Sequence, residues 1–379
     1  MMRGGAMMRC ATRIDGGQAM RSRHGGKKFV PMRLVALRCA LFVIAGGVAC
    51  AGPAAAADAA GGDLQAYRHD LALKLQKSPS PRDWALASQL LETRPVTGVS
   101  LHERGLILQK AARAAPQDRL VQTLWASIPL QDQRCRAGQR CADQRAALAR
   151  LEPDNGAAWV LAIGKGDHPG TEAALMHVAG AQRYSEHLGQ AIAAWREVFR
   201  RYPPPLPEVH PTDGADASTA SGDQLDLIFD EAATTAVPAT ASLFEACRKT
   251  SHPNAGAKRF ETCGKIARLM MGRSQTLIGR LSGVALLRAS HAGSKADIDM
   301  VRAVTWQYEQ YLKIEPDIDS IAVAKQNYLN LIQTTDSEIQ AIQYELRIWG
   351  VPLTPPVGWK QTVDGKRVEP LDELPGKAP

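Results

Sequence analysis

The cysteines are the residues of this chain whose spacing most directly predicts chemistry. Four of the seven lie beyond residue 57, at Cys135, Cys141, Cys247 and Cys263. An even number in an exported chain is typical of disulfide bonds, and four cysteines allow three pairings. Proximity in the chain favours Cys135–Cys141 and Cys247–Cys263, because each would close a short local loop. Each bond would contribute about 2–3 kcal/mol to stability.

A zinc site is the competing interpretation of these cysteines. Ligand pairs in structural zinc sites usually lie about two to four residues apart, and neither cysteine pair has that spacing. No histidine completes a ligand set: His177 and His187 are ten positions apart, and we expect each at the surface or half-buried. We therefore predict two disulfide bonds, no metal site and no cofactor.

Carboxylates at helical spacing are the second set of residues able to do chemistry. Asp223, Asp226 and Asp230 follow at intervals of three and four positions, with Glu231 beside the last. A pair of carboxylates on one helix face could act as general acid and base. A solvated helix face explains these acids better. Because the chain has no phosphate-binding loop, zinc-protease motif or nucleophile elbow, we predict no catalytic residue.

The first 57 residues have the features of an export signal preceded by extra sequence. From Met32, a short basic region leads into an apolar run, Ala40–Val48, and then into small residues. This order predicts a secretory signal peptide that is cleaved between Ala57 and Asp58, with residues 1–31 as an upstream extension. The apolar run is about half of the roughly 20 residues that a spanning helix needs, so we expect no transmembrane span.

Cys50 supports an alternative to a free exported protein. The segment Gly47-Val48-Ala49-Cys50 resembles a lipobox, although Gly47 stands where an aliphatic residue is usual. Lipidation of Cys50 would anchor the protein to a membrane. We therefore predict a periplasmic or secreted protein, with a membrane-anchored lipoprotein as the alternative.

The net charge of the chain argues against a nucleic-acid partner. The whole chain carries a formal charge of +8. Residues 1–57 contain nine Lys and Arg and one Asp, so the rest of the chain holds 37 basic and 37 acidic side chains. The basic character thus belongs to the export segment, and the remainder lacks the excess of cations that nucleic-acid binding requires.

Apolar residues recur at helical spacing through most of the chain after residue 57, and no alternating runs predict strands. The sequence therefore predicts an all-α fold. Prolines and small residues divide it into a helical region 58–202, a flexible linker 203–222, a second helical region 223–349 and a proline-rich extended tail 350–379. Within the second region, the apolar pattern predicts one long helix over 260–288.

Three of the expected helices end in similar proline turns, at Pro116, Pro153 and Pro316. The second turn, with Trp159 early in the next helix, resembles the junction between tetratricopeptide repeats. The resemblance covers about a third of the chain after the export signal. The Leu-Gly pair that follows the Trp in that family is replaced here by Leu161-Ala162-Ile163. Pro116 and Pro153 lie 37 residues apart, against a repeat of about 34 residues.

This resemblance implies stacked helical hairpins that present a surface to a protein or peptide ligand. An irregular helical bundle is the alternative architecture. The predicted function is therefore a non-catalytic periplasmic or secreted protein that binds another protein or a peptide. The alternative is a cell-envelope hydrolase whose carboxylates assemble only in three dimensions. An aromatic-lined groove would favour the first function, and a pocket with converging carboxylates would favour the second.

Overall fold

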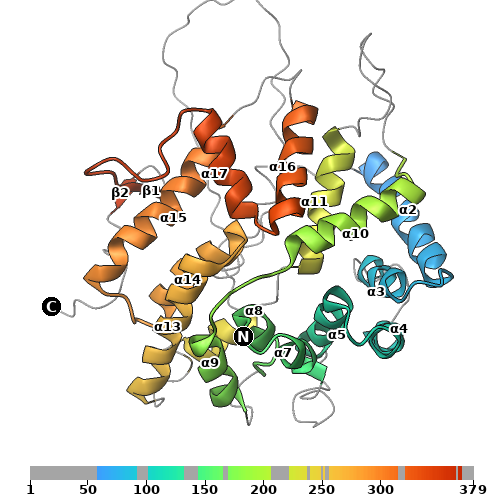
Figure 1. Cartoon of the computed structure of the whole chain (residues 1–379), viewed down its shortest axis with the longest axis horizontal. Helices are drawn as coiled ribbons and strands as arrows, with labels where there is room; N and C mark the ends of the chain where they lie inside the picture. The colour runs from blue at the N-terminus through green and yellow to red at the C-terminus, as the bar shows by residue number, and fades with distance from the viewer. Residues whose placement is uncertain are drawn as a thin grey trace, which may run out of the picture. The chain divides into compact units, whose positions relative to one another are not determined.

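The computed structural model of the chain describes residues 58–91, 101–131, 144–164, 170–205, 222–236, 240–248, 251, 256–314, 321–363 and 366–368. These residues are mostly helical, so the predicted all-α fold is confirmed (Figure 1). All of them belong to one compact unit, residues 51–379.

The elements are, in chain order, α2 (Asp58–Gln76), α3 (Pro81–Leu90), α4 (Leu101–Ala114), α5 (Arg119–Gln131), α7 (Ala147–Leu151), α8 (Gly156–Val160), α9 (Thr171–Gly180), α10 (Leu188–Arg201), α11 (Gly222–Ala236), α12 (Ala241–Cys247), α13 (Ala257–Arg273), α14 (Leu277–Ala289), the 3-10 turn η3 (Lys295–Asp297), α15 (Ile298–Tyr311), α16 (Ile321–Thr335), α17 (Glu338–Ile348), β1 (Gln361–Val363) and β2 (Lys366–Val368).

Helices that follow one another in the chain pack together in several places. α2 packs on α3, α3 on α4, and α4 on α5; later in the chain α13 packs on α14, and α16 on α17 (Figure 1). Contacts between distant segments tie these groups together, because α9 packs on α13, and α10 packs on both α11 and α16.

α10 shows how the sequence produces this packing. Leu188, Ile192, Trp195 and Phe199 recur at intervals of four and three positions, so they form one face of the helix. All four are at most 1% exposed. The indole Nε1 of Trp195 donates to Thr235 Oγ1 of α11 at 3.0 Å, which satisfies the only polar group of that side chain. The apolar pattern thus fixes which face of α10 is buried.

The linker predicted at 203–222 lies mostly among residues 206–221, outside the described residues. α10, which ends at Arg201, packs on α11, which begins at Gly222. The division of the chain into two helical regions remains a prediction.

The structure corrects the single helix predicted over 260–288. α13 ends at Arg273 and α14 begins at Leu277, and the two helices pack on each other (Figure 1). Thr276 caps the second helix, because its side chain accepts a hydrogen bond from the backbone of Gly279 at 3.0 Å. A cap of this kind satisfies a donor that the first turn of a helix leaves free.

Two buried carboxylates hold the α13–α14 turn. Glu186 accepts hydrogen bonds from the hydroxyls of Ser274 and Thr276. Glu338 accepts a hydrogen bond from the backbone N–H of Leu277 at 2.7 Å. Burial raises the pKa of Glu186 to about 7 and also raises the pKa of Glu338. These acids therefore complete the start of α14 from other parts of the chain.

The tail contains a second difference from expectation, because the sequence predicts no strands. β1 and β2 form a short antiparallel pair in which Thr362 lies opposite Arg367. Before the pair, Trp359 makes an edge-on contact with Trp306, with ring centroids 5.4 Å apart. Trp306 Nε1 also donates to the carbonyl of Pro352 at 2.7 Å. The tail is thus attached to α15.

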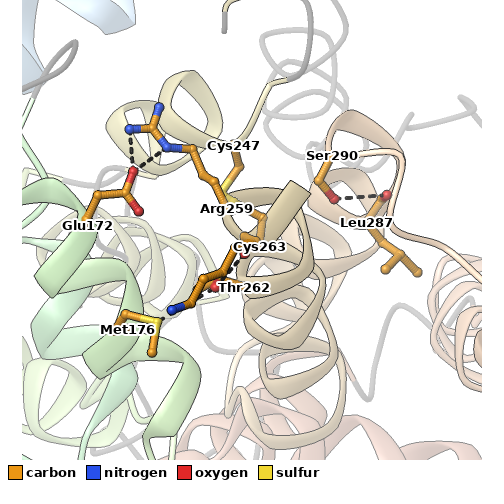
Figure 2. The surroundings of a disulfide bond; sticks show 9 residues. Glu172, Met176, Cys247, Arg259, Thr262, Cys263, Leu287 and Ser290 are labelled. Atoms are coloured by element: carbon orange, nitrogen blue, oxygen red, sulfur yellow. Dashed lines mark hydrogen bonds and ion pairs between the residues drawn. A yellow bond between two sulfur atoms is a disulfide. The ribbon is translucent and has the colours of Figure 1, made fainter. Parts of the chain in front are cut away.

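The predicted pair Cys247–Cys263 is present as a disulfide bond, with the two Cα atoms 5.7 Å apart. It joins the end of α12 to α13, and both side chains are fully buried. Figure 2 shows that an ion pair between Glu172 of α9 and Arg259 of α13 lies nearby. The disulfide and the ion pair thus attach two other helices, α12 and α9, to α13.

The other predicted cysteine pair, Cys135–Cys141, lies outside the described residues, as do Cys50 and Ala57. Asp58 is the first described residue. Within the part of the chain that the structure describes, no helix is both long enough and apolar enough to cross a membrane.

Candidate functional site

An open cleft of about 220 Å³ lies where four segments meet. Arg82 comes from α3 and Gln190 from α10, while Gln117 and Asp118 immediately precede α5. Arg119, the first residue of α5, and Leu151, the last residue of α7, complete the lining. Five of these six side chains are polar, so the cleft presents hydrogen-bonding groups and not an apolar or aromatic surface.

Asp118 is the one carboxylate that lines the cleft, and both of its oxygens are in use. Oδ1 accepts from the backbone of Leu120 at 3.0 Å and of Val121 at 3.2 Å, and so caps α5. Oδ2 accepts from Arg82 Nε at 2.9 Å. These bonds fix the guanidinium of Arg82 against the start of α5 and leave Asp118 poorly suited to act as a base.

Beneath the cleft, Arg119 reaches a buried carboxylate. Glu152, 1% exposed, follows α7, and its Oε1 lies 2.8 Å from Arg119 Nε and 3.3 Å from Arg183. Both guanidinium groups therefore lie close enough to Oε1 to balance its charge. Oε2 accepts from Asn155 Nδ2 at 2.8 Å and lies 2.6 Å from His187 Nε2.

These partners explain the ionisation of Glu152. Burial by itself would raise the pKa of the carboxyl, because it disfavours the charged form. Hydrogen bonds from His187 and Asn155, and the charges of His187 and Arg183, outweigh that effect and lower the pKa of Glu152 to about 2. Glu152 is therefore a permanent anion beneath the cleft.

His187 occupies the centre of this buried network. It is 4% exposed and precedes α10 in a left-handed conformation, with φ 58°. Burial by itself would lower the pKa of the imidazole, but Asp336 and Glu152 together raise it to about 9. The ring therefore carries a charge at neutral pH and links two carboxylates that come from distant parts of the chain.

Asp336, at the turn between α16 and α17, forms the other side of the network. It also has a left-handed backbone, with φ 53°. Its Oδ1 accepts from the backbone of Gly189 at 2.9 Å, and its Oδ2 accepts from Ser185 Oγ at 3.1 Å and lies 3.5 Å from His187 Nδ1. A Cβ at Gly189 would lie 2.7 Å from the carbonyl of Ile332, so only glycine permits this approach.

Gln190 connects the network to the cleft. It lines the cleft, and its Nε2 lies 3.4 Å from His187 Nδ1. Arg119 makes the second connection, because it lines the cleft and pairs with Glu152. Gln190 and Arg119, which face the cleft, are thus positioned directly by the buried residues His187 and Glu152.

Two of the acids singled out in the sequence form ion pairs with other helices. Asp226 pairs with Lys325 of α16, and Glu231 pairs with Arg68 of α2 at 2.5 Å. Glu231 is only 5% exposed, so the interpretation of a solvated face is wrong at this residue. Asp223 and Asp230 are exposed. The cluster fastens α11 to α2 and α16.

Sequence reasoning missed the network for identifiable reasons. Glu152 and Asn155 fall in the proline turn that resembles a repeat junction, where their side chains carry no signal of burial. His187 was expected at the surface or half-buried, and its burial corrects that expectation. Gly189 and Asp336 lie 147 positions apart, a pairing that no local pattern can indicate.

Comparison with known proteins found no matching family model, no matching curated protein and no matching solved structure.

Proposed function

We propose that this protein is a periplasmic or secreted helical protein that binds a polar segment of another protein or of a peptide in the cleft between α3, α5, α7 and α10. The observation that carries the proposal is the cleft lining, in which Arg82, Arg119, Gln117 and Gln190 come together from three separate segments. The resemblance to repeat junctions supports a binding role, and the disulfide supports an exported location.

The chemistry of the lining favours main-chain groups over a charged ligand. Arg82 pairs with Asp118 and Arg119 pairs with Glu152, so each cation already has a partner. The carboxamides of Gln117 and Gln190 each carry a donor and an acceptor, which are the groups that a peptide bond offers in return. At about 220 Å³, the cleft suits a short stretch of extended chain and is smaller than most sites for whole small molecules.

The hydrolase alternative gains less support from the same geometry. Glu152 and Asp336 do converge, on His187, as such an enzyme would require. Glu152 and His187 are only 1% and 4% exposed, so a substrate in the cleft cannot touch them. The half-buried acid of the cleft, Asp118, is occupied as a helix cap. Binding is therefore the function we propose, with anchoring through Cys50 retained as the alternative to a free periplasmic protein.

Site-specific photo-crosslinking in the native cell envelope tests this function. A photoreactive residue at position 117 should capture the bound segment, because Gln117 lines the cleft. The matched control carries the same residue at position 340, an exposed glutamine of α17. We expect one adduct, identified by mass spectrometry, from position 117 only. Equal adducts from both positions, or none from position 117, would exclude the cleft as the binding site.

A further inference from the structure

The imidazole of His187 faces two partners that compete for one of its nitrogens. Nε2 is committed to Glu152, at 2.6 Å. Nδ1 lies between Asp336 Oδ2, at 3.5 Å, and Gln190 Nε2, at 3.4 Å. The two Nδ1 distances are nearly equal, so small movements of the ring or of either partner decide which bond forms.

These two partners require opposite states of Nδ1. A carboxylate only accepts hydrogen bonds, so Asp336 requires a protonated Nδ1. The nitrogen of a carboxamide only donates, so Gln190 requires a bare Nδ1. An imidazolium satisfies Asp336, and a neutral ring with its proton on Nε2 satisfies Gln190 while it keeps the bond to Glu152.

We propose that His187 is a proton-operated switch that exchanges Asp336 for Gln190 as the partner of its Nδ1. In the protonated state, Nδ1–H donates to Asp336, and the amide nitrogen of Gln190 is free to serve the cleft. When the Nδ1 proton leaves to solvent, Nε2–H stays on Glu152 and Nδ1 accepts a hydrogen bond from Gln190. Asp336 then loses its contact with the ring, while its bonds to Gly189 and Ser185 do not depend on that proton.

The other charged groups around the ring do not compete for this role. Arg119 of α5 and Arg183, before α10, face Glu152 and hold its charge. Glu186 is next in sequence, but its carboxyl is bound by Ser274 and Thr276. Asp154 pairs with Arg183. Glu152 and Asp336 are therefore the acids that bear on the imidazole.

The backbone conformations of His187 and Asp336 support two alternative arrangements of the contact between these residues. Both His187 and Asp336 hold the left-handed conformation that residues other than glycine rarely adopt. Such residues gather where the surrounding structure overrides a local preference, and they are frequent in switching segments. In this chain the two residues face each other, so their contact is one of the links between the start of α10 and the α16–α17 turn.

The consequence for the cleft rests on the proposed function. Gln190 offers its amide nitrogen either to a bound main-chain carbonyl or to neutral His187. Deprotonation should therefore weaken binding, and a bound segment should favour the protonated ring by the same factor, because the coupling is reciprocal. The pKa of the imidazole is about 9, so the ring is charged at neutral pH. The protonated, binding-competent state is therefore the one populated at neutral pH.

Nitrogen NMR of the imidazole, recorded on the full-length folded protein across the titration of His187, tests the switch. We expect Nδ1 to change to an unprotonated nitrogen while Nε2 keeps its proton, and the side-chain amide signals of Gln190 to move with the same midpoint. Loss of the proton from Nε2 instead, or stationary Gln190 signals, would overturn the switch. Crosslinking at position 117 is independent of this result, so failure of the proposed function is recognised separately.

Three conservative variants separate the switch from a purely structural role. Asp336→Asn keeps an oxygen for the N–H of Gly189 but removes the charge, and should lower the His187 midpoint by about one pH unit. Gln190→Ala removes the partner of the neutral ring, and should raise the midpoint by roughly half a unit. Gln340→Ala, on the exposed side of α17, should leave it unchanged. An unchanged midpoint in Gln190→Ala would contradict the exchange of partners.

Discussion

At His187, burial lowers the pKa of the imidazole and the two neighbouring carboxylates raise it, and the carboxylates prevail. The imidazole is held between Glu152 and Asp336, and its pKa is raised from the ordinary value of 6.5 to about 9. The folded state therefore keeps a proton that the unfolded state releases at lower pH. The contribution to the free energy of unfolding is complete below pH 6.5 and is lost as the pH rises towards 9.

We therefore expect the free energy of unfolding to fall by about 2–3 kcal/mol between these two pH values. Urea denaturation at a series of pH values measures this slope. His187→Gln, which cannot titrate, is the matched variant and should have a flatter profile. If the profiles of wild type and variant run parallel, the buried imidazolium is not the source of the pH dependence.

Removing a buried charge from this network should lower the free energy of unfolding more than removing an exposed charge. Glu152→Gln leaves Arg119, Arg183 and His187 around a neutral amide, and the buried imidazolium of His187 loses a counter-charge. We expect a loss of about 3–5 kcal/mol in the free energy of unfolding. Glu197→Gln, in an exposed pair with Arg200, is the control and should cause no measurable change. Equal effects of the two variants would mean that the buried charges do not stabilise the fold.

At the scale of elements, the contact between α13 and α14 requires a glycine at position 283. A Cβ at Gly283 would lie 2.8 Å from the backbone of both Ala267 and Met271, so the helices would have to separate. We expect Gly283→Ala to cost about 1–3 kcal/mol in chemical denaturation. Gly272, in α13, has open space at the same position, and Gly272→Ala should stabilise by about 1 kcal/mol through helix propensity. Stabilisation by both variants would contradict the close packing.

The disulfide between α12 and α13 belongs to the same scale. It closes a loop with a sequence separation of 16 residues. Replacement of both Cys247 and Cys263 by Ser should lower the free energy of unfolding by about 3 kcal/mol, because the unfolded chain regains conformational freedom. Thermal melting of the two proteins without reductant measures the loss as a decrease in Tm. The difference should vanish when reductant is added, and its persistence would indicate that packing of the serines is responsible.

For the whole molecule, hydrophobic periodicity predicted the fold class because most helices bury one continuous face. The buried stripe of α10, from Leu188 to Phe199, is visible in the sequence alone. The break between α13 and α14 is not, since Ser274 and Thr276 are compatible with a helix. They end it here because Glu186, 88 positions from Ser274, binds both hydroxyls. The short β1–β2 pair is equally hidden, because it has too few residues to show alternation.

The site was less predictable than the fold, because it depends on contacts between segments that are far apart in the chain. Its lining comes from α3, α5, α7 and α10, and its buried network adds the α16–α17 turn. None of these segments contains a local pattern of paired acids, histidines and arginines. Patterns of that kind reveal sites that one helix or loop carries entirely, whereas this site exists only through packing.

The distance along the chain between Asp336 and α10 also has a consequence for the order of assembly. In the first turn of α10, the backbone N–H of Gly189 donates to Asp336, a residue 147 positions later. As the chain emerges from the ribosome with its N-terminus first, α10 can form but its start stays incomplete until the α16–α17 turn has been synthesised. The start of α10 beside the cleft that Gln190 lines is therefore completed late, and in a chain truncated before residue 336 the N–H of Gly189 should lack this partner.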